Sequence, residues 1–116
     1  MKLTKEEIER IIDYEIVVDC YTIDEANMGW AVYMKENLHF PFEAEYLMKR
    51  KSGESQWKQV SVVGNESDES SFGGGEWYVE VELEGLIVPA RLSRLKNIKA
   101  DKKTMQTLQV WDSRNR

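Results

Sequence analysis

Three carboxylates lie close together in the stretch VVDCYTIDEANMGW, the segment from Val17 to Trp30. They are Asp19, Asp24 and Glu25. Carboxylate groups act as acids and bases in catalysis, and their oxygens are ligands for hard cations such as Ca2+. A structural role is the alternative for Asp24 and Glu25, because both are expected in the first turn of a helix, where negative charge is favoured. Asp19 precedes that helix, so it would serve as a cap, an ion-pair partner or a cation ligand shared with Glu25.

The sequence offers little for nucleophilic catalysis. Cys20 and His39 are the only cysteine and the only histidine, and nothing around Cys20 resembles the strained turn of a catalytic nucleophile. Gly73-Gly74-Gly75 is not followed by the lysine and hydroxyl residue of a phosphate-binding loop. The scarcity of histidine and cysteine also argues against zinc and other transition metals. The chain is therefore predicted not to be an enzyme, and hard cations are the remaining class of metal.

No segment matches the helix–loop–helix calcium motif. The loop from Asn65 to Glu76 has a suitable length and ends in glutamate, but it begins with asparagine. Ser70 occupies the sixth position, where the motif requires the glycine of a sharp turn. Strands rather than helices are expected on both sides of this loop. A calcium site would therefore have to be assembled from different segments, for which the chain has 21 acidic residues.

The size and charge of the chain limit its classes of partner. Its 116 residues suffice for a single domain with one core, and its formal net charge of −5 disfavours nucleic acid, whose phosphates bind to lysine and arginine. A single cysteine cannot form an internal disulfide, which favours a reducing compartment. No apolar run approaches the roughly 18–20 residues of a membrane span, and the charged start MKLTKEEIER does not resemble a signal peptide. We expect a cytoplasmic protein that binds neither nucleic acid nor membranes.

A first helix is expected near the N-terminus, in a helical segment over residues 1–38. Thr4 and Glu7 have the spacing of a capping box, and isoleucines follow on one helical face. These signals predict a helix from about Lys5 to about Glu15. The β-branched stretch after it either extends this helix or breaks into an extended link.

A second helix is expected over residues 23–38. Thr22 and Glu25 have the spacing of another capping box. Gly29 lies inside the predicted helix, where glycine costs about 1 kcal/mol relative to alanine. Such a glycine indicates close packing against a neighbouring element.

After the proline of HFPF the period of the sequence changes to that of strands. The segments FEAEYLMKR, WKQVSVV, EWYVEVEL and LIVPARL alternate or are rich in strand formers. Glu84-Gly85 is a tight hairpin signal, and the polar stretch from Asn65 to Gly75 is expected to be a flexible hairpin loop. The predicted fold is therefore α+β, with an antiparallel SH3-like barrel over residues 42–98 that would protect the edges of four or five short strands. A short C-terminal helix is expected within residues 99–116.

One long block of residues resembles a known family. The segment from Glu15 to Ala44 is similar to the CcbP-like calcium-binding proteins of cyanobacteria and other bacteria. The matching elements are Ile16-Val17-Val18-Asp19, Tyr21, Glu25, Met28-Gly29-Trp30, Tyr33, Phe40-Pro41-Phe42 and Ala44. The resemblance resumes from Val79 to Asp101 and includes Thr104 and Trp111, whereas the middle of the chain, from Lys49 to Gly75, does not align.

This resemblance implies a small acidic protein that buffers or senses Ca2+ by binding it at surface carboxylates. The chain departs from the family pattern in two places. Thr22 and Ile23 dilute the acidic run after Tyr21, and Arg91 enters a strand where the family has an apolar or neutral residue. The acidic positions that match the family, and that the resemblance implies as calcium ligands, are Asp19, Asp24, Glu25 and Glu43.

A different class of function is left open by the residues alone. SH3-like barrels often present an aromatic groove to a protein segment, and Trp57 or Trp77 would anchor such a partner if it were exposed. This interaction module would bind its protein partner without any metal. A pull-down with and without a chelator separates the two functions.

Overall fold

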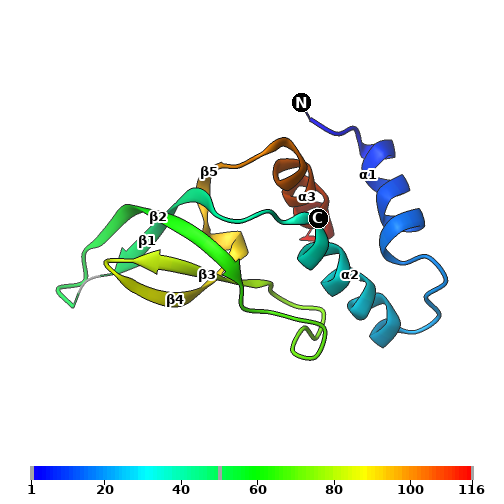
Figure 1. Ribbon diagram of the computed structural model, residues 1–116, viewed down its shortest axis with the longest axis horizontal. Coiled ribbons are helices and arrows are strands. Elements are labelled where there is room, and N and C mark those ends of the chain that lie inside the picture. Colours follow the sequence, from blue (N-terminus) through cyan, green and yellow to red (C-terminus); the bar gives the residue numbers. More distant parts are fainter. Residues whose placement is uncertain (1, 50, 116) are drawn as a thin grey trace. The chain divides into compact units, whose positions relative to one another are not determined.

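The computed structural model describes residues 2–49 and 51–115, and it describes Asn115 by its backbone alone. The chain divides into two compact units. The helical unit is made of Met1–His39, Ser67–Gly75 and Asp101–Arg116, and the sheet unit of Phe40–Glu66 and Glu76–Ala100. Figure 1 shows the helices of the first unit and the strands of the second. In the part of the chain that is described, no helix combines the length and the apolar character needed to cross a membrane.

The first helix, α1 (Lys5–Ile11), begins at the predicted capping box. The Thr4 hydroxyl oxygen accepts a hydrogen bond from the backbone N–H of Glu7 at 3.1 Å, and the Glu7 carboxylate accepts one from the N–H of Thr4 at 3.1 Å. Beyond α1 the chain continues as a π-helical turn (Ile12–Ile16) and leaves the helix at Val17. The β-branched stretch therefore extends the helix by one wide turn before breaking it.

The second helix, α2 (Ile23–Asn37), begins at Thr22, whose hydroxyl oxygen accepts from the N–H of Glu25 at 3.1 Å. The predicted capping box is only half formed, because the Glu25 carboxylate accepts from the Thr22 hydroxyl at 3.3 Å. A Cβ on Gly29 would lie 2.1 Å from the carbonyl oxygen of Ile16. The predicted close packing at Gly29 is therefore confirmed, and the neighbour is the end of the π-helical turn.

The third helix, α3 (Lys102–Asp112), runs into a 3-10 turn (Ser113–Asn115) and confirms the predicted C-terminal helix. Its Trp111 packs edge-on against Trp30 of α2, with ring centroids 5.9 Å apart. Phe72, from the loop segment Ser67–Gly75, lies 5.7 Å from the Trp111 ring, centroid to centroid. These buried rings form the core of the helical unit.

Arg114 covers this aromatic cluster. Its guanidinium carbon lies 4.1 Å from the ring centroid of Trp111, 4.9 Å from that of Trp30 and 5.4 Å from that of Phe72. The same guanidinium donates a hydrogen bond to the carbonyl oxygen of Gly74 at 2.7 Å. Because the loop supplies both Phe72 and Gly74, Arg114 attaches the loop to the helices.

In the described part of the sheet unit, five antiparallel strands lie in the order β4-β3-β2-β1-β5. Their bounds are β1 (Phe42–Lys49), β2 (Ser55–Asn65), β3 (Tyr78–Leu83), β4 (Leu86–Arg91) and β5 (Lys96–Lys99). The predicted turn at Glu84-Gly85 joins β3 to β4, and both of its residues have positive φ, 52° and 82°. The α+β fold class is thus confirmed.

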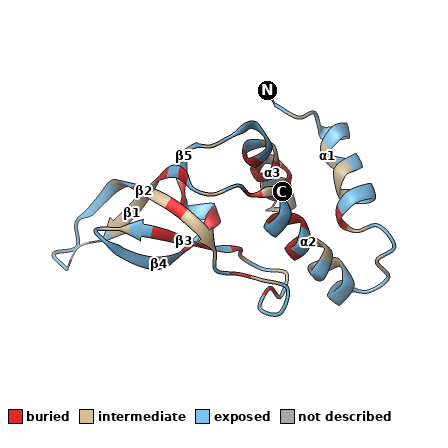
Figure 2. Cartoon of the chain, viewed as in Figure 1, coloured by how far each residue is buried: buried red, intermediate tan, exposed pale blue. Residues whose placement is uncertain are grey.

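One face of the sheet is apolar and buried, as the alternation of residue types predicts. Val79 and Val81 of β3 are fully buried, and Val62 of β2 pairs with Val81 in the register. Glu80 and Glu82 alternate with these valines and therefore point to the opposite face. Figure 2 shows the buried positions on the strands.

The sheet does not close into the predicted SH3-like barrel. Among the described residues β4 pairs only with β3 and β5 pairs only with β1, so both strands remain edges. These edges are protected in ways that make closure unnecessary. Pro89 removes a backbone donor from β4, and the four-residue β5 carries Lys96 and Lys99.

Candidate functional site

Asp19 lies in the turn that connects the π-helical turn to α2. Its backbone has a φ of 56°, a left-handed conformation that aspartate tolerates better than most residues. Its side chain is exposed and forms no ion pair with the residues that the structure describes. The sulfur of Cys20, the next residue, lies 3.8 Å from the position that a Cβ on Gly29 would take. Packing against α2 therefore positions the backbone that carries the Asp19 carboxylate.

Asp24 and Glu25 lie in the first turn of α2, as predicted, and both side chains are exposed. The free N–H groups at the start of the helix favour their negative charge. From Ile11 to Met34 the sequence has five carboxylates and no lysine, arginine or histidine. The three candidate ligands of the helical unit therefore lie within a stretch that supplies no positive charge of its own.

Glu43 belongs to the sheet unit and is exposed on β1. It lies opposite Lys99 of β5 in the strand register, so an opposite charge is its cross-strand neighbour. Among the described residues, no group of three or more histidine, cysteine, aspartate or glutamate side chains is placed to hold a metal ion. The four predicted ligands therefore do not form a ready-made cage, and their joint role stays a prediction.

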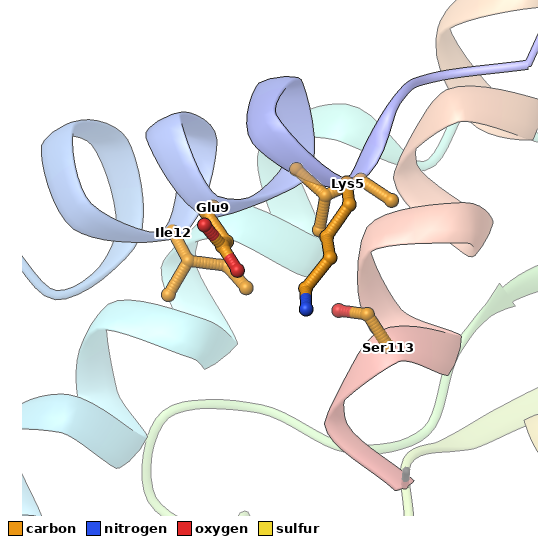
Figure 3. A pocket seen from close by; sticks show the side chains of 5 residues that line it. Lys5, Glu9, Ile12 and Ser113 are labelled. Carbon is orange, nitrogen blue, oxygen red and sulfur yellow. The ribbon is translucent and has the colours of Figure 1, made fainter.

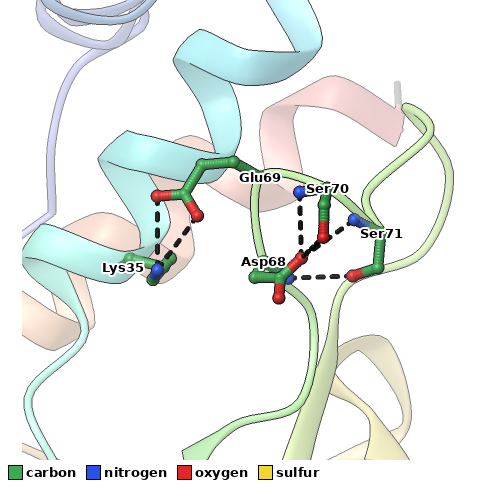
Figure 4. Close-up of polar contacts among 5 residues, drawn as sticks. All are labelled: Lys35, Asp68, Glu69, Ser70 and Ser71. Carbon is green, nitrogen blue, oxygen red and sulfur yellow. Dashed lines mark hydrogen bonds and ion pairs between the residues drawn. The ribbon is translucent and has the colours of Figure 1, made fainter.

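A second group of carboxylates lies in the loop Ser67–Gly75, where sequence reasoning expected no order. The Asp68 carboxylate accepts hydrogen bonds from the N–H groups of Ser70 and Ser71, both at 2.9 Å, and from the Ser70 hydroxyl at 2.7 Å (Figure 4). The Ser70 hydroxyl and the two N–H groups hold the pKa of Asp68 below its usual value. The run Ser-Asp-Glu-Ser-Ser is the signal for this turn, because aspartate side chains often accept from N–H groups two and three residues later.

Glu69 attaches the same loop to α2. Its carboxylate forms an ion pair with Lys35, with Oε2 and Nζ 3.0 Å apart (Figure 4). A hydrogen bond from its own backbone N–H, and then the bond from Lys35, lower the pKa of Glu69. Ser67 and Phe72 of the loop are buried. The loop therefore has its own polar network and apolar contacts, and its flexibility stays a prediction.

His39 and Cys20 have separate partners in the structure. The His39 Nδ1 lies 2.6 Å from a carboxylate oxygen of Asp101, and the Cys20 sulfur lies 3.6 Å from the carbonyl oxygen of Val18. Hydrogen bonds from Thr104 and from His39 lower the pKa of Asp101 to about 2. Asp101 caps α3 and contacts His39, so this pair has a structural explanation.

A hollow of about 590 Å3 lies beside α1 (Figure 3). Ile8 and Ile12 supply its apolar lining, and Lys5, Glu9 and Ser113 supply its polar groups. The lysine amine would repel a cation, and one carboxylate with one hydroxyl supplies few of the oxygens that calcium requires. This hollow is therefore not a candidate for a cation site.

The two tryptophans predicted as anchors of an interaction module differ in exposure. Trp77 is fully buried, and its Nε1 donates to the Asn65 side-chain oxygen at 3.0 Å, so the prediction of Trp77 as an exposed anchor is wrong. Trp57 is 43% exposed, and the Lys96 Nζ lies 5.6 Å from its ring centroid. The closed barrel of an SH3-like module is not formed among the described residues.

Comparisons with known proteins agree with the resemblance seen in the sequence. A family model described as calcium binding, of the CcbP type, matches residues 9–113. The crystal structure of CcbP from Anabaena is similar with a TM-score of 0.77 and 32% sequence identity, over 96% of this chain and 92% of that one. A calcium-binding protein solved in its calcium-binding form is similar with a TM-score of 0.74 and 30% identity, over 94% and 89% of the two chains. No match was found among curated proteins.

Proposed function

Because the chain belongs to the CcbP family of calcium-binding proteins, we propose that it binds Ca2+ through the exposed carboxylates Asp19, Asp24 and Glu25. The observation that carries the proposal is the family match over residues 9–113, which includes all three residues. Their placement in a stretch without basic residues supports it. Calcium binding by these carboxylates does not require a helix–loop–helix calcium motif.

The distribution of charge over the two units favours the helical unit for cation binding. The sheet unit has eight acidic and eight basic residues and is neutral. The helical unit has thirteen acidic and eight basic residues, so it carries the whole formal net charge of −5. A concentration of negative charge raises the local concentration of cations and speeds their arrival.

The chemistry of the three side chains suits calcium. Ca2+ takes about six to eight oxygen ligands, and three carboxylates with backbone carbonyls and water can supply them. Exposed side chains have to lose rotamer freedom to meet around the ion, which weakens binding. The dissociation constant is therefore expected between about one micromolar and one millimolar, a range that suits buffering or sensing.

Glu43 is the fourth predicted ligand, and it remains a prediction. Its carboxylate is exposed on β1, but the neighbouring charge of Lys99 reduces its attraction for a cation. Replacement of Glu43 by glutamine is therefore expected to change calcium affinity less than replacement of Asp19 by asparagine.

Isothermal titration with calcium chloride, and with magnesium chloride in parallel, tests calcium binding, and backbone amide NMR spectra locate it. The amides from Asp19 to Glu25 should shift on titration, and a combined D19N, D24N and E25Q variant should lose the heat. The matched control is Glu54→Gln, which removes one exposed carboxylate from the turn between β1 and β2 and should keep the affinity. The absence of heat and of chemical-shift change at millimolar calcium would refute the function, and shifts confined to other residues would refute the site.

A further inference from the structure

The apolar face of the sheet is buried at one end and half-exposed at the other. On β3, Val81 is fully buried, whereas Leu83 next to the β3–β4 turn is half-exposed. On β1 the same change occurs between the buried Ala44 and the half-exposed Met48. Each pair lies two residues or a multiple of two apart, so its members point to the same face. The open sheet therefore leaves apolar surface near its turns.

A hollow of about 490 Å3 lies over this end of the sheet. Its apolar lining includes Tyr46, Met48, Leu83 and Val88. Its charged lining residues are Lys49 and Arg94. Arg94 reaches it from the 3-10 turn Leu92–Arg94 that follows β4.

Two further hollows of about 410 and 300 Å3 share Tyr46 and Arg94 with the first, so the three adjoin at these side chains. One of them adds Tyr78 and Arg91, and the other adds Trp57 and Lys96. We call the three together the Arg94 groove. Among the described residues that line it, four are basic, three are aromatic and none is a carboxylate: the basic ones are Lys49, Arg91, Arg94 and Lys96.

Two carboxylates of the sheet unit lie beside the groove lining: Glu45 is opposite Lys96 in the strand register, and the Glu76 carboxylate accepts a hydrogen bond from the N–H of Ser93 at 3.4 Å. Glu80 and Glu82 alternate with the buried valines of β3 and share a face with Tyr78, but neither is among the described residues that line the groove. Glu84, in the β3–β4 turn, forms an ion pair with Lys58. The described lining itself has four basic side chains and no carboxylate, so a unit with no net charge presents a local surface that is positive and apolar together.

We propose that the Arg94 groove binds an acidic peptide segment that carries a large apolar side chain. The lining of Met48, Leu83 and Val88 suits the apolar side chain, because its burial removes exposed apolar surface from water. An arginine guanidinium binds a carboxylate by two parallel hydrogen bonds. Arg91 and Arg94 supply such guanidinium groups in the groove lining.

Nucleic acid fits this groove less well than an acidic peptide. Single strands stack their bases on aromatic rings, whereas much of this lining is aliphatic. The net charge of −5 also repels a polyanion more strongly than a short peptide with a few carboxylates. All groove residues belong to the sheet unit, and none is a proposed calcium ligand, so binding is expected to be independent of Ca2+.

Fluorescence anisotropy in the presence of a calcium chelator tests this proposal. The probe is a labelled acidic peptide with a leucine and a phenylalanine at its centre, and a matched peptide replaces both apolar residues by serine. The intact peptide should bind and the serine peptide should not. Arg94→Gln should weaken binding by about threefold to fivefold, which is the upper part of the range measured for one exposed pair of opposite charges. Lys51→Gln, which removes a basic residue outside the groove lining, should leave the affinity unchanged.

Methyl and indole NMR signals add a readout that does not depend on substitutions. Peptide binding should shift Met48, Val88 and Trp57. The proposal is overturned by no anisotropy change at millimolar protein, by equal binding of the serine peptide, or by tighter binding of a short oligothymidine. None of these results bears on calcium titration of the unlabelled protein, so failure of one function is distinguishable from failure of the other.

Discussion

Gly29→Ala tests whether the packing of α2 against the π-helical turn holds the helical unit together. The added methyl group would lie 2.1 Å from the Ile16 carbonyl oxygen, nearly an ångström inside the 3.0 Å that real Cβ contacts respect. The obstacle is a backbone atom, so it cannot rotate away as the end of a long side chain does. Either α2 or the end of the π-helical turn has to move.

The expected size of the effect is a difference between a gain and a cost. Alanine is favoured over glycine inside a helix by about 1 kcal/mol. Forcing extra atoms into a filled site costs about 1–3 kcal/mol, and a clash with backbone belongs at the upper end. The net change in the free energy of unfolding is therefore a loss of about 2 kcal/mol. For a chain of this length, that loss lowers Tm by about 6–12 °C.

Thermal melts followed by far-UV circular dichroism measure this change. Gly73→Ala is the matched control, since a Cβ there would meet no heavy atom within 4 Å and no positive φ is involved. Its Tm should stay the same or rise slightly, because alanine reduces the freedom of the unfolded chain. A Gly29→Ala protein with an unchanged or higher Tm would show that helix propensity outweighs this contact, and the reasoning would fail.

Three further predictions concern the ligands, the aromatic cluster and the cap of α3. In isothermal titration, Asp19→Asn should weaken calcium binding by about tenfold, and Glu69→Gln should weaken it by no more than about twofold. The reason is that Glu69 already pairs with Lys35, whereas Asp19 has no ion-pair partner among the described residues. The opposite order would place the site in the loop. Arg114→Ala should lower the free energy of unfolding by about 2 kcal/mol, because it removes the contacts with the aromatic rings and the hydrogen bond to the loop. Urea titrations followed by tryptophan fluorescence measure this change, and an unchanged midpoint would contradict it. Asp101 has its folded-state pKa lowered from 3.8 to about 2, so its carboxylate contributes stability that is present above about pH 4 and lost as the pH falls through about 2. The Asp101→Asn variant should therefore be less stable than the unmodified protein at pH 7, and its Tm should fall less between about pH 5 and pH 2. Equal falls in Tm for the two proteins over this pH range would refute the prediction.

Features that depend on residues a few positions apart were predictable. Thr4 and Glu7 form their capping box within one turn of chain, and Glu84-Gly85 makes its hairpin turn without help from other segments. Gly29 could be recognised as a packing position because glycine is unfavourable inside a helix without a reason. The position of Asp24 and Glu25 in the first turn of α2 follows from the same local signals.

Features that depend on distant partners were not predictable from local pattern. The open sheet results from β5 pairing with β1 while β4 remains at the other edge, and short strands alone do not fix that pairing. The contacts that attach the loop to the helices come from Lys35 and Arg114, which are far from it in sequence. Trp77 is buried by the sheet, although its neighbours Glu76 and Tyr78 are not.

The candidate site was predictable in part for the same reason. Its residue types and its place at the start of α2 can be read from the sequence, whereas the left-handed backbone of Asp19 depends on how the chain turns between two helices. The coordination of an ion depends further on side-chain rotamers, which exposed carboxylates choose only when the ion is present.

The order in which the chain visits its two units has a consequence for folding during synthesis. The strands pair mostly with neighbours in the sequence, β1 with β2 and β3 with β4, so the sheet closes short loops. The helical unit joins segments from both ends of the chain, as in the hydrogen bond from the N–H of Leu3 to the Gln109 side chain, 106 positions later. Because long loops close more slowly than short ones, the hairpins should form on the ribosome first. The aromatic rings of α2 would then remain exposed to solvent until Trp111 and Arg114 leave the ribosome. During this interval the nascent chain is most prone to aggregation.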